Sequence, residues 1–102
     1  QFSAVFVASD VVAFGAMAAI REHNLRIPQD IALVGFDDVP ISRYVDPSLT
    51  TVHLPIEELA RCAGEMVVDL VRGVKPSKMQ VLLDAHLLVR KSCGAPSTAS
   101  SK

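Results

Sequence analysis

The first third of the chain places one apolar helix pattern between two short apolar runs. Residues 4–8 and 31–36 are uninterrupted apolar runs, and each predicts a strand covered on both faces, as in a parallel sheet. Between them, Ser9 and Asp10 are favourable helix N-cap residues, and residues 11–23 are predicted to form a helix. Strand, helix and strand over about 30 residues make a βαβ unit, whose crossover is almost always right-handed.

The first predicted helix is apolar on every side. Positions 11–20 carry no charge, and the first basic residue of this segment is Arg21. A helix that is apolar all round is buried all round. One face can pack on the sheet of its own chain, and the opposite face needs other cover. Contact with a second chain is favoured by the surplus of apolar surface, and a central position in a single core is the alternative.

The strongest amphipathic pattern lies in the middle of the chain. Apolar residues recur every three or four positions from Ile56 to Val71, and Pro55 occupies a natural first-turn position. This pattern predicts a helix over 55–72. Residues 50–54, which precede it, are β-branched and partly alternating, and they predict a strand or an extended crossing segment.

The remaining segments are shorter. Residues 41–45 predict a helical turn, and the apolar stretches 81–83 and 87–89 are typical of strands. The Ser-, Ala- and Thr-rich composition of residues 92–102 is typical of a flexible tail.

Composition narrows the classes of protein to consider. The 102 residues, 50% of them hydrophobic, suffice for one small core. A formal charge of -1 argues against a surface that contacts nucleic acid directly. The longest uncharged run has ten residues, short of the roughly 20 of a membrane-spanning helix, and no signal-peptide pattern opens the chain. Cys62 and Cys93 lack motif spacing and are expected to be reduced thiols, as in a cytosolic protein.

Two adjacent carboxylates follow the second predicted strand. Asp37 and Asp38 would lie at the carboxyl end of a parallel strand, where open α/β sheets bind ligands, beside Ser9 and Asp10. A carboxylate accepts up to about four hydrogen bonds, which suits the hydroxyls of a sugar or the N–H groups of a base. Neighbouring side chains of an extended chain point opposite ways, so we expect Asp37 to face the ligand and Asp38 to cap a turn. Capping by Asp37 itself is the alternative.

No motif supports catalysis. The sequence contains no G-x-S-x-G, no H-E-x-x-H and no glycine-rich phosphate loop. None of the three histidines has a partner at metal-ligand spacing, so neither a metal nor a cofactor is expected. The acids and lysine of a response-regulator receiver are not matched. A binding protein is expected, and a small hydrolase or isomerase that uses Asp37 and His53 is the alternative.

Five segments, in this order, resemble the C-terminal part of the effector-binding region of LacI/GalR-family bacterial transcriptional regulators. They are Ala-Ser-Asp with Ala-Phe-Gly-Ala, Arg-Ile-Pro-Gln-Asp-Ile, Val-Gly-Phe-Asp-Asp, Leu-Thr-Thr-Val and Leu-Val-Arg-Lys-Ser. The similarity runs from about Ala4 to Cys93. Each segment alone is a weak signal, and the combination is specific.

The resemblance implies an α/β fold of the periplasmic-binding-protein-like type I, a parallel sheet with flanking helices. In that fold, three chain segments cross between two lobes and a small effector binds in the cleft. Residues 1–91 would form the C-terminal part of the effector-binding and dimerisation domain. Residues 4–46 and 80–91 would lie in the C-terminal lobe, and residues 50–73 would supply a crossing strand and a helix of the N-terminal lobe.

The resemblance also implies roles for individual residues. Its effector-binding positions are Asp37, Ser9, Leu54, Ile56 and His53. Leu54 stands where relatives often have glutamine, and Ile56 where an aromatic residue can occur, so the effector, a sugar or a nucleobase, is not identified. Its homodimer-interface positions are Phe14, Ile41, Tyr44 and Val45.

The implied mechanism is allosteric control of a repressor in the cytoplasm. An effector would change the arrangement of the lobes, a coupling typically worth about 1–3 kcal/mol, and so change operator binding. DNA would be contacted only through an N-terminal helix-turn-helix outside these residues. The alternative is part of a periplasmic sugar-binding protein of a transporter, and a signal peptide instead of a helix-turn-helix in the upstream sequence would distinguish it.

Overall fold

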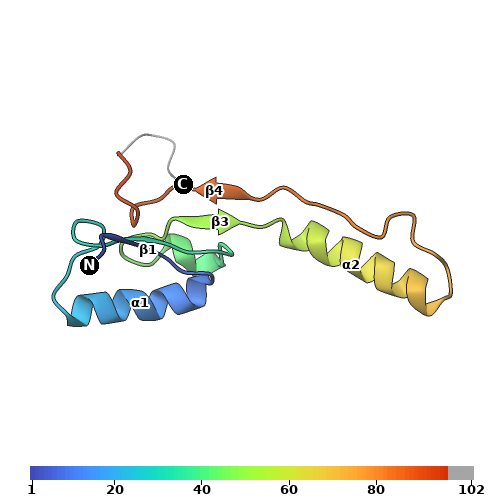
Figure 1. Ribbon diagram of the computed structural model, residues 1–102, viewed down its shortest axis with the longest axis horizontal. Coiled ribbons are helices and arrows are strands. Elements are labelled where there is room, and N and C mark those ends of the chain that lie inside the picture. The colour runs from blue at the N-terminus through green and yellow to red at the C-terminus, as the bar shows by residue number, and fades with distance from the viewer. Residues whose placement is uncertain (97–102) are drawn as a thin grey trace. The chain divides into compact units, whose positions relative to one another are not determined.

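The computed structural model describes residues 1–96, which fall into two compact units. The first unit contains residues 1–53 and the segment that begins at residue 86, and the second contains residues 54–85. In chain order the elements are β1 (Ala4–Phe6), α1 (Asp10–Glu22), β2 (Ala32–Val34), the 3-10 helix η1 (Pro40–Arg43), β3 (Thr51–His53), α2 (Ile56–Val71) and β4 (His86–Leu88) (Figure 1).

The strands of the first unit form the predicted parallel sheet with one antiparallel edge. β1 pairs in parallel with β2, with Val5 opposite Leu33. Beyond β2, the chain runs parallel to β3. The Gly35 amide donates to the Thr50 carbonyl, and the Asp37 amide donates to the Val52 carbonyl. β4 pairs antiparallel with β3. The two-stranded sheets β1-β2 and β3-β4 are thus joined by parallel bridges, which bring the carboxyl ends of β1, β2 and β3 to one edge.

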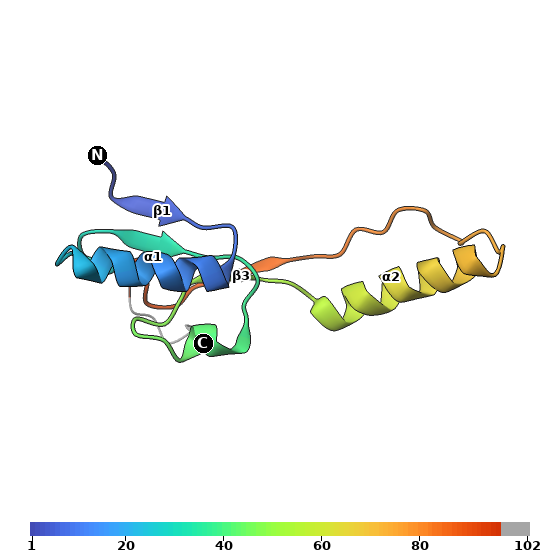
Figure 2. The same ribbon diagram turned by 90° about the horizontal axis from the view of Figure 1, so that it is seen from below.

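The helix α1 forms where the sequence predicts it and covers one face of the sheet (Figure 2). Asn24, with φ 61°, is in the left-handed conformation expected at the end of the helix. Ala13 and Met17 point from α1 into a core that also contains Leu33 and Leu49. The βαβ unit of the sequence analysis is therefore confirmed.

This chain does not itself cover the first strand and helix on all sides, so the alternative of a central helix in a single core is wrong. Phe6 of β1 is 62% exposed, and Val11 and Val12 of α1 are 65% and 62% exposed. Within residues 1–96, α1 is the only α-helix of the first unit, so no second helical layer covers these side chains. The apolar surface in excess of one core, which the sequence predicted, is present.

The second unit contains the predicted amphipathic helix. Glu57 and Glu58 lie in the first turn of α2, where carboxylates interact favourably with the helix dipole, and Gly73 follows its end with φ 75°. No residue of α2 is buried. Residues 81–83 run back along α2 without forming the predicted strand. Among the helices of the described chain, none combines the length and hydrophobicity that crossing a bilayer requires.

The predicted tail begins later than residue 92. The Ser92 side chain is fully buried, its hydroxyl donates to the Leu33 carbonyl at 2.6 Å, and it accepts the Thr50 amide at 2.9 Å. Ser92 therefore joins the end of the chain to the sheet of the first unit. Residues 97–102, the rest of the predicted tail, lie outside the described residues.

Candidate functional site

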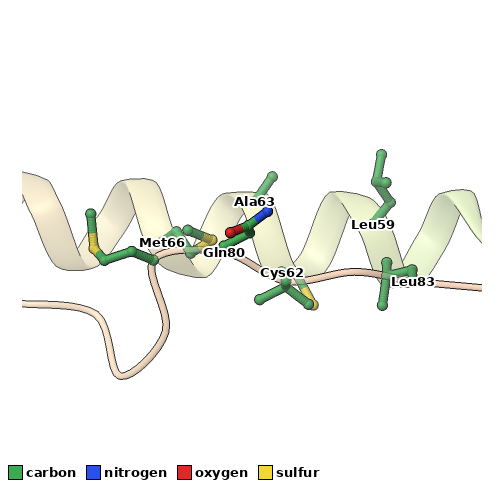
Figure 3. Close-up of a pocket in the computed structure, with 8 residues that line it drawn as sticks. Leu59, Cys62, Ala63, Met66, Gln80 and Leu83 are labelled. Atoms are coloured by element: carbon green, nitrogen blue, oxygen red, sulfur yellow. The ribbon is translucent and has the colours of Figure 1, made fainter.

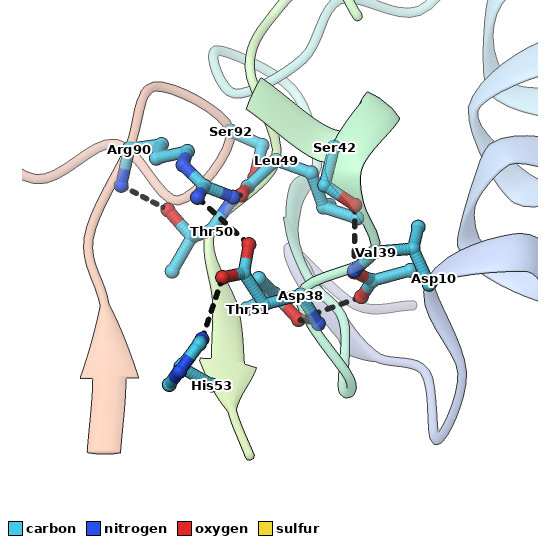
Figure 4. A network of polar contacts seen from close by, with 10 residues as sticks. All are labelled: Asp10, Asp38, Val39, Ser42, Leu49, Thr50, Thr51, His53, Arg90 and Ser92. Carbon is cyan, nitrogen blue, oxygen red and sulfur yellow. Dashed lines mark hydrogen bonds and ion pairs between the residues drawn. The ribbon is translucent and has the colours of Figure 1, made fainter. Parts of the chain in front are cut away.

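Asp10 is fully buried, and its carboxylate connects α1 with η1 and β3. Asp10, the first residue of α1, accepts hydrogen bonds from the Ser42 hydroxyl at 2.6 Å and the Val39 amide at 3.0 Å through one oxygen, and from the Thr51 hydroxyl at 2.6 Å through the other (Figure 4). The sequence predicted a helix cap at the strand ends and gave no indication of this network. The partners lie 29 to 41 residues away, so no local signal could have identified this role.

Asp38 is the centre of a second network, and does more than cap a local turn. Its side chain is 6% exposed, and its two oxygens bind the Arg90 guanidinium and Nδ1 of His53, each at 2.8 Å (Figure 4). Arg90 also donates to the Leu49 carbonyl at 3.0 Å. Burial opposes ionisation of Asp38 most strongly, but the hydrogen bonds and charges of Arg90 and His53 together outweigh it, so the pKa of this carboxyl lies below its ordinary value.

Asp37 differs from its neighbour in having an unoccupied carboxylate. Its backbone, with φ 125°, donates to the Val52 carbonyl at 3.0 Å and forms a parallel bridge with His53. The side chain is half-buried, and with the described residues it makes neither a hydrogen bond nor an ion pair. The Asp37 carboxylate can therefore accept hydrogen bonds from a molecule at this edge of the sheet.

The structure brings three of the five predicted effector-binding residues to one region. Ser9 is half-buried at the end of β1, and the amide of Asp10 next to it donates to the Phe36 carbonyl at 3.0 Å, so Ser9 lies beside the end of β2. Asp37 and His53 occupy the ends of the next two chain segments in the sheet. Leu54, half-buried, and Ile56, exposed, belong to the second unit.

The four predicted dimer residues fall into two classes. Ile41 and Tyr44, within and directly after η1, are 52% and 73% exposed. Phe14 and Val45 are half-buried and pack against the core of their own chain. Ile41 and Tyr44 are therefore the members of the set with most surface to offer another molecule.

The second unit has a separate apolar groove between α2 and the segment that returns along it (Figure 3). Its volume is about 310 Å³. Most of the side chains that line it are apolar or sulfur-containing, among them Leu59, Cys62, Ala63, Met66, Val81 and Leu83. This groove contains none of the predicted site residues. Cys62 and Cys93 are free thiols, as expected.

Comparison with known proteins gives consistent matches over most of the chain. The family described as the periplasmic binding protein-like domain matches residues 2–93. The chain is 39% identical over 90 residues to the HTH-type transcriptional repressor PurR of Edwardsiella ictaluri, and 35% identical over 89 residues to the HTH-type transcriptional regulator CelR of Thermobifida fusca. It covers 26% of each, so the chain spans about a quarter of the length of these relatives.

Solved structures agree with the sequence matches. A complex of the transcriptional regulator CelR with cellobiose superposes with a TM-score of 0.80 at 34% identity, over 88% of this chain and 28% of that one. The lac repressor dimer bound to operator and the anti-inducer ONPF superposes with a TM-score of 0.78 at 36% identity, over 89% of this chain and 32% of that one. These relatives are transcriptional regulators and not enzymes. The chain belongs to the periplasmic-binding-protein-like domain family, in the form found in the effector-binding region of LacI-type transcriptional regulators.

Proposed function

We propose that this chain supplies part of the binding site for a small effector, a sugar or a nucleobase, in a regulator whose operator binding the effector controls. The observation that carries the proposal is the contrast between two neighbouring carboxylates. Asp38 is occupied by Arg90 and His53, whereas Asp37 has no partner among the described residues. Asp37 is thus an acceptor held at the strand ends, where sheets of this class bind ligands.

The chemistry of the neighbouring residues favours a ligand that donates several hydrogen bonds. The Asp37 carboxylate would accept from vicinal hydroxyls or ring N–H groups, with the Ser9 hydroxyl and the His53 ring as further polar contacts. The cellobiose complex of the similar regulator CelR supports a sugar among the candidates.

The same proposal includes a homodimer in which the first unit belongs to the C-terminal lobe. Exposed Ile41 and Tyr44 would form the centre of the contact, with Phe14 and Val45 behind them. The effector would favour one arrangement of the lobes and thereby change the spacing of helix-turn-helix domains outside this chain, in the cytoplasm. The dimeric lac repressor on its operator supports this arrangement.

The test is a thermal-shift screen of the regulator that contains this chain with pentoses, hexoses, disaccharides, polyols and purines. For the compound that raises the melting temperature most, the Kd is then measured with Asp37→Asn. This substitution keeps the size and the tolerance for positive φ but removes the charge. Because hydrogen bonds to a charged group are worth about 1.5–3 kcal/mol, we expect the Kd to rise at least tenfold.

The matched control is Asp46→Asn, which changes an exposed acid in the loop after η1. It should leave the Kd unchanged. Full retention of affinity by Asp37→Asn would exclude this residue from the effector site. Equal losses in both variants would point to net charge as the cause.

A further inference from the structure

Two histidines that lie far apart in the sequence face each other on neighbouring strands. His53 is the last residue of β3 and His86 the first of β4, and the antiparallel register places them directly opposite. Their ring centroids are 5.1 Å apart, with the planes at 42°. Only the pairing of β3 with β4 brings the two histidines together, so their spacing in the sequence gave no indication of this contact.

The Asp38 carboxylate occupies one nitrogen of the His53 ring. Its Nδ1 faces the Asp38 carboxylate at 2.8 Å, and since a carboxylate only accepts, Nδ1 carries the proton. Asp38 is in turn held by Arg90 at 2.8 Å. A carboxylate behind one ring nitrogen fixes the tautomer and the orientation of the ring, as it does for metal-bound histidines. In the neutral form of the ring, Nε2 of His53 therefore has a lone pair, on a side chain that is 42% exposed.

The spacing of the rings suits a shared ion. Two imidazoles that bind one tetrahedral metal at about 2 Å per Zn–N bond hold their ring centroids about 5 Å apart. The observed separation of 5.1 Å is close to this value, so the spacing of the two rings is compatible with one ion between them.

We propose that His53 and His86 together bind one divalent transition-metal ion, with Zn²⁺ as the reference case. In the described residues no group of three or more His, Cys, Asp or Glu side chains is arranged to hold a metal. The site therefore supplies two protein ligands, and water completes the coordination. Such a site is open and exchangeable, and the bound ion links β3 to β4 where the chain leaves the first unit and returns to it.

The test uses Zn²⁺ alone, added to the chain without any effector, and follows the ring-nitrogen NMR signals of the three histidines. We expect the signals of His53 and His86 to shift together at the same zinc concentration, while those of His23 do not. Because the readout is at the imidazole rings, zinc bound by Cys62 or Cys93 does not imitate the result. Zinc that leaves both rings unshifted overturns the proposal.

The matched variants are His86→Ala and His23→Ala, each of which removes one exposed histidine. His86→Ala should raise the zinc Kd at the His53 ring at least tenfold, because one of two ligands is lost, and His23→Ala should leave it unchanged. An unchanged Kd in folded His86→Ala, or equal effects of both variants, would contradict the shared site.

Discussion

The Ser42 hydroxyl donates a 2.6 Å hydrogen bond to the Asp10 carboxylate, and this contact connects η1 to the first turn of α1 across 32 residues of sequence. Both side chains are fully buried. Since the Thr51 hydroxyl binds the other oxygen, the same carboxylate also fixes the start of β3. Asp10 thereby holds in place the chain segments that carry the proposed effector contacts.

Replacing Asp10 with alanine should strongly destabilise the first unit. The substitution leaves two buried hydroxyl donors and one half-buried amide without an acceptor. Hydrogen bonds to charged groups are worth about 1.5–3 kcal/mol each. We expect a loss of about 3 kcal/mol or more in the free energy of unfolding, measured by urea denaturation. Asp84→Ala, at an exposed position, is the control and should change little. An unchanged free energy of unfolding in Asp10→Ala would show that water replaces the carboxylate.

Gly35 and Gly15 should respond in opposite directions to alanine. A Cβ on buried Gly35 would collide with a carboxylate oxygen of Asp10 and approach Leu49 Cδ2 to 3.0 Å, so Gly35→Ala should cost about 1–3 kcal/mol. Gly15 lies within α1 with nothing inside 4 Å, and alanine there should stabilise the chain by about 0.5–1 kcal/mol. Thermal melts of the two variants measure both effects. If Gly35→Ala also raised the melting temperature, the packing around Gly35 would be looser than described.

The pH dependence of stability should report the Asp38 network. The pKa of this carboxyl is lower in the folded state than its ordinary value of about 3.9. Ionised Asp38 therefore contributes its full stabilisation above that ordinary value, and the contribution disappears as the pH falls through the folded-state pKa. The difference in unfolding free energy between the unsubstituted chain and Asp38→Asn should shrink as the pH falls below about 4. A difference that stays constant would mean that the ion pairs with Arg90 and His53 do not stabilise the fold.

Tyr44→Glu should weaken the proposed dimer. Tyr44 is 73% exposed, so a charge here disturbs its own chain little but is costly inside an apolar contact. Sedimentation velocity should show a shift towards monomer. His23→Glu, at the C-terminal end of α1, is the control and should sediment as the unsubstituted chain does. Phe14 is less suitable because it packs on the core. A monomeric unsubstituted chain would contradict the proposal.

Local patterns were enough to predict the helices and the parallel βαβ unit. The apolar period of α2 and the cap residues before α1 act within a few positions, which is the range that sequence reasoning covers well. The resemblance of the five segments to LacI-type regulators predicted the family, which the comparisons confirmed.

What the sequence could not predict depends on contacts between distant residues. The role of Asp10, the contacts of Asp38 and the histidine pair all require contacts between residues that are 15 to 52 positions apart in the sequence. The burial of Ser92 also depends on a distant residue. Nothing in the polar sequence around Ser92 indicates that its hydroxyl will donate to the Leu33 carbonyl. The strand expected over 81–83 failed for a related reason, since an apolar stretch becomes a strand only where a partner edge is available.

The backbone of the two acids limits how this site can change. Asp37 and Asp38 have φ values of 125° and 58°, a region that suits glycine and is tolerated by asparagine and aspartate but is costly for branched or bulky side chains. Substitutions here are thus confined to a narrow set of small residues. A change of effector would then require substitutions mainly at the residues around this pair, while the two acids stay unchanged.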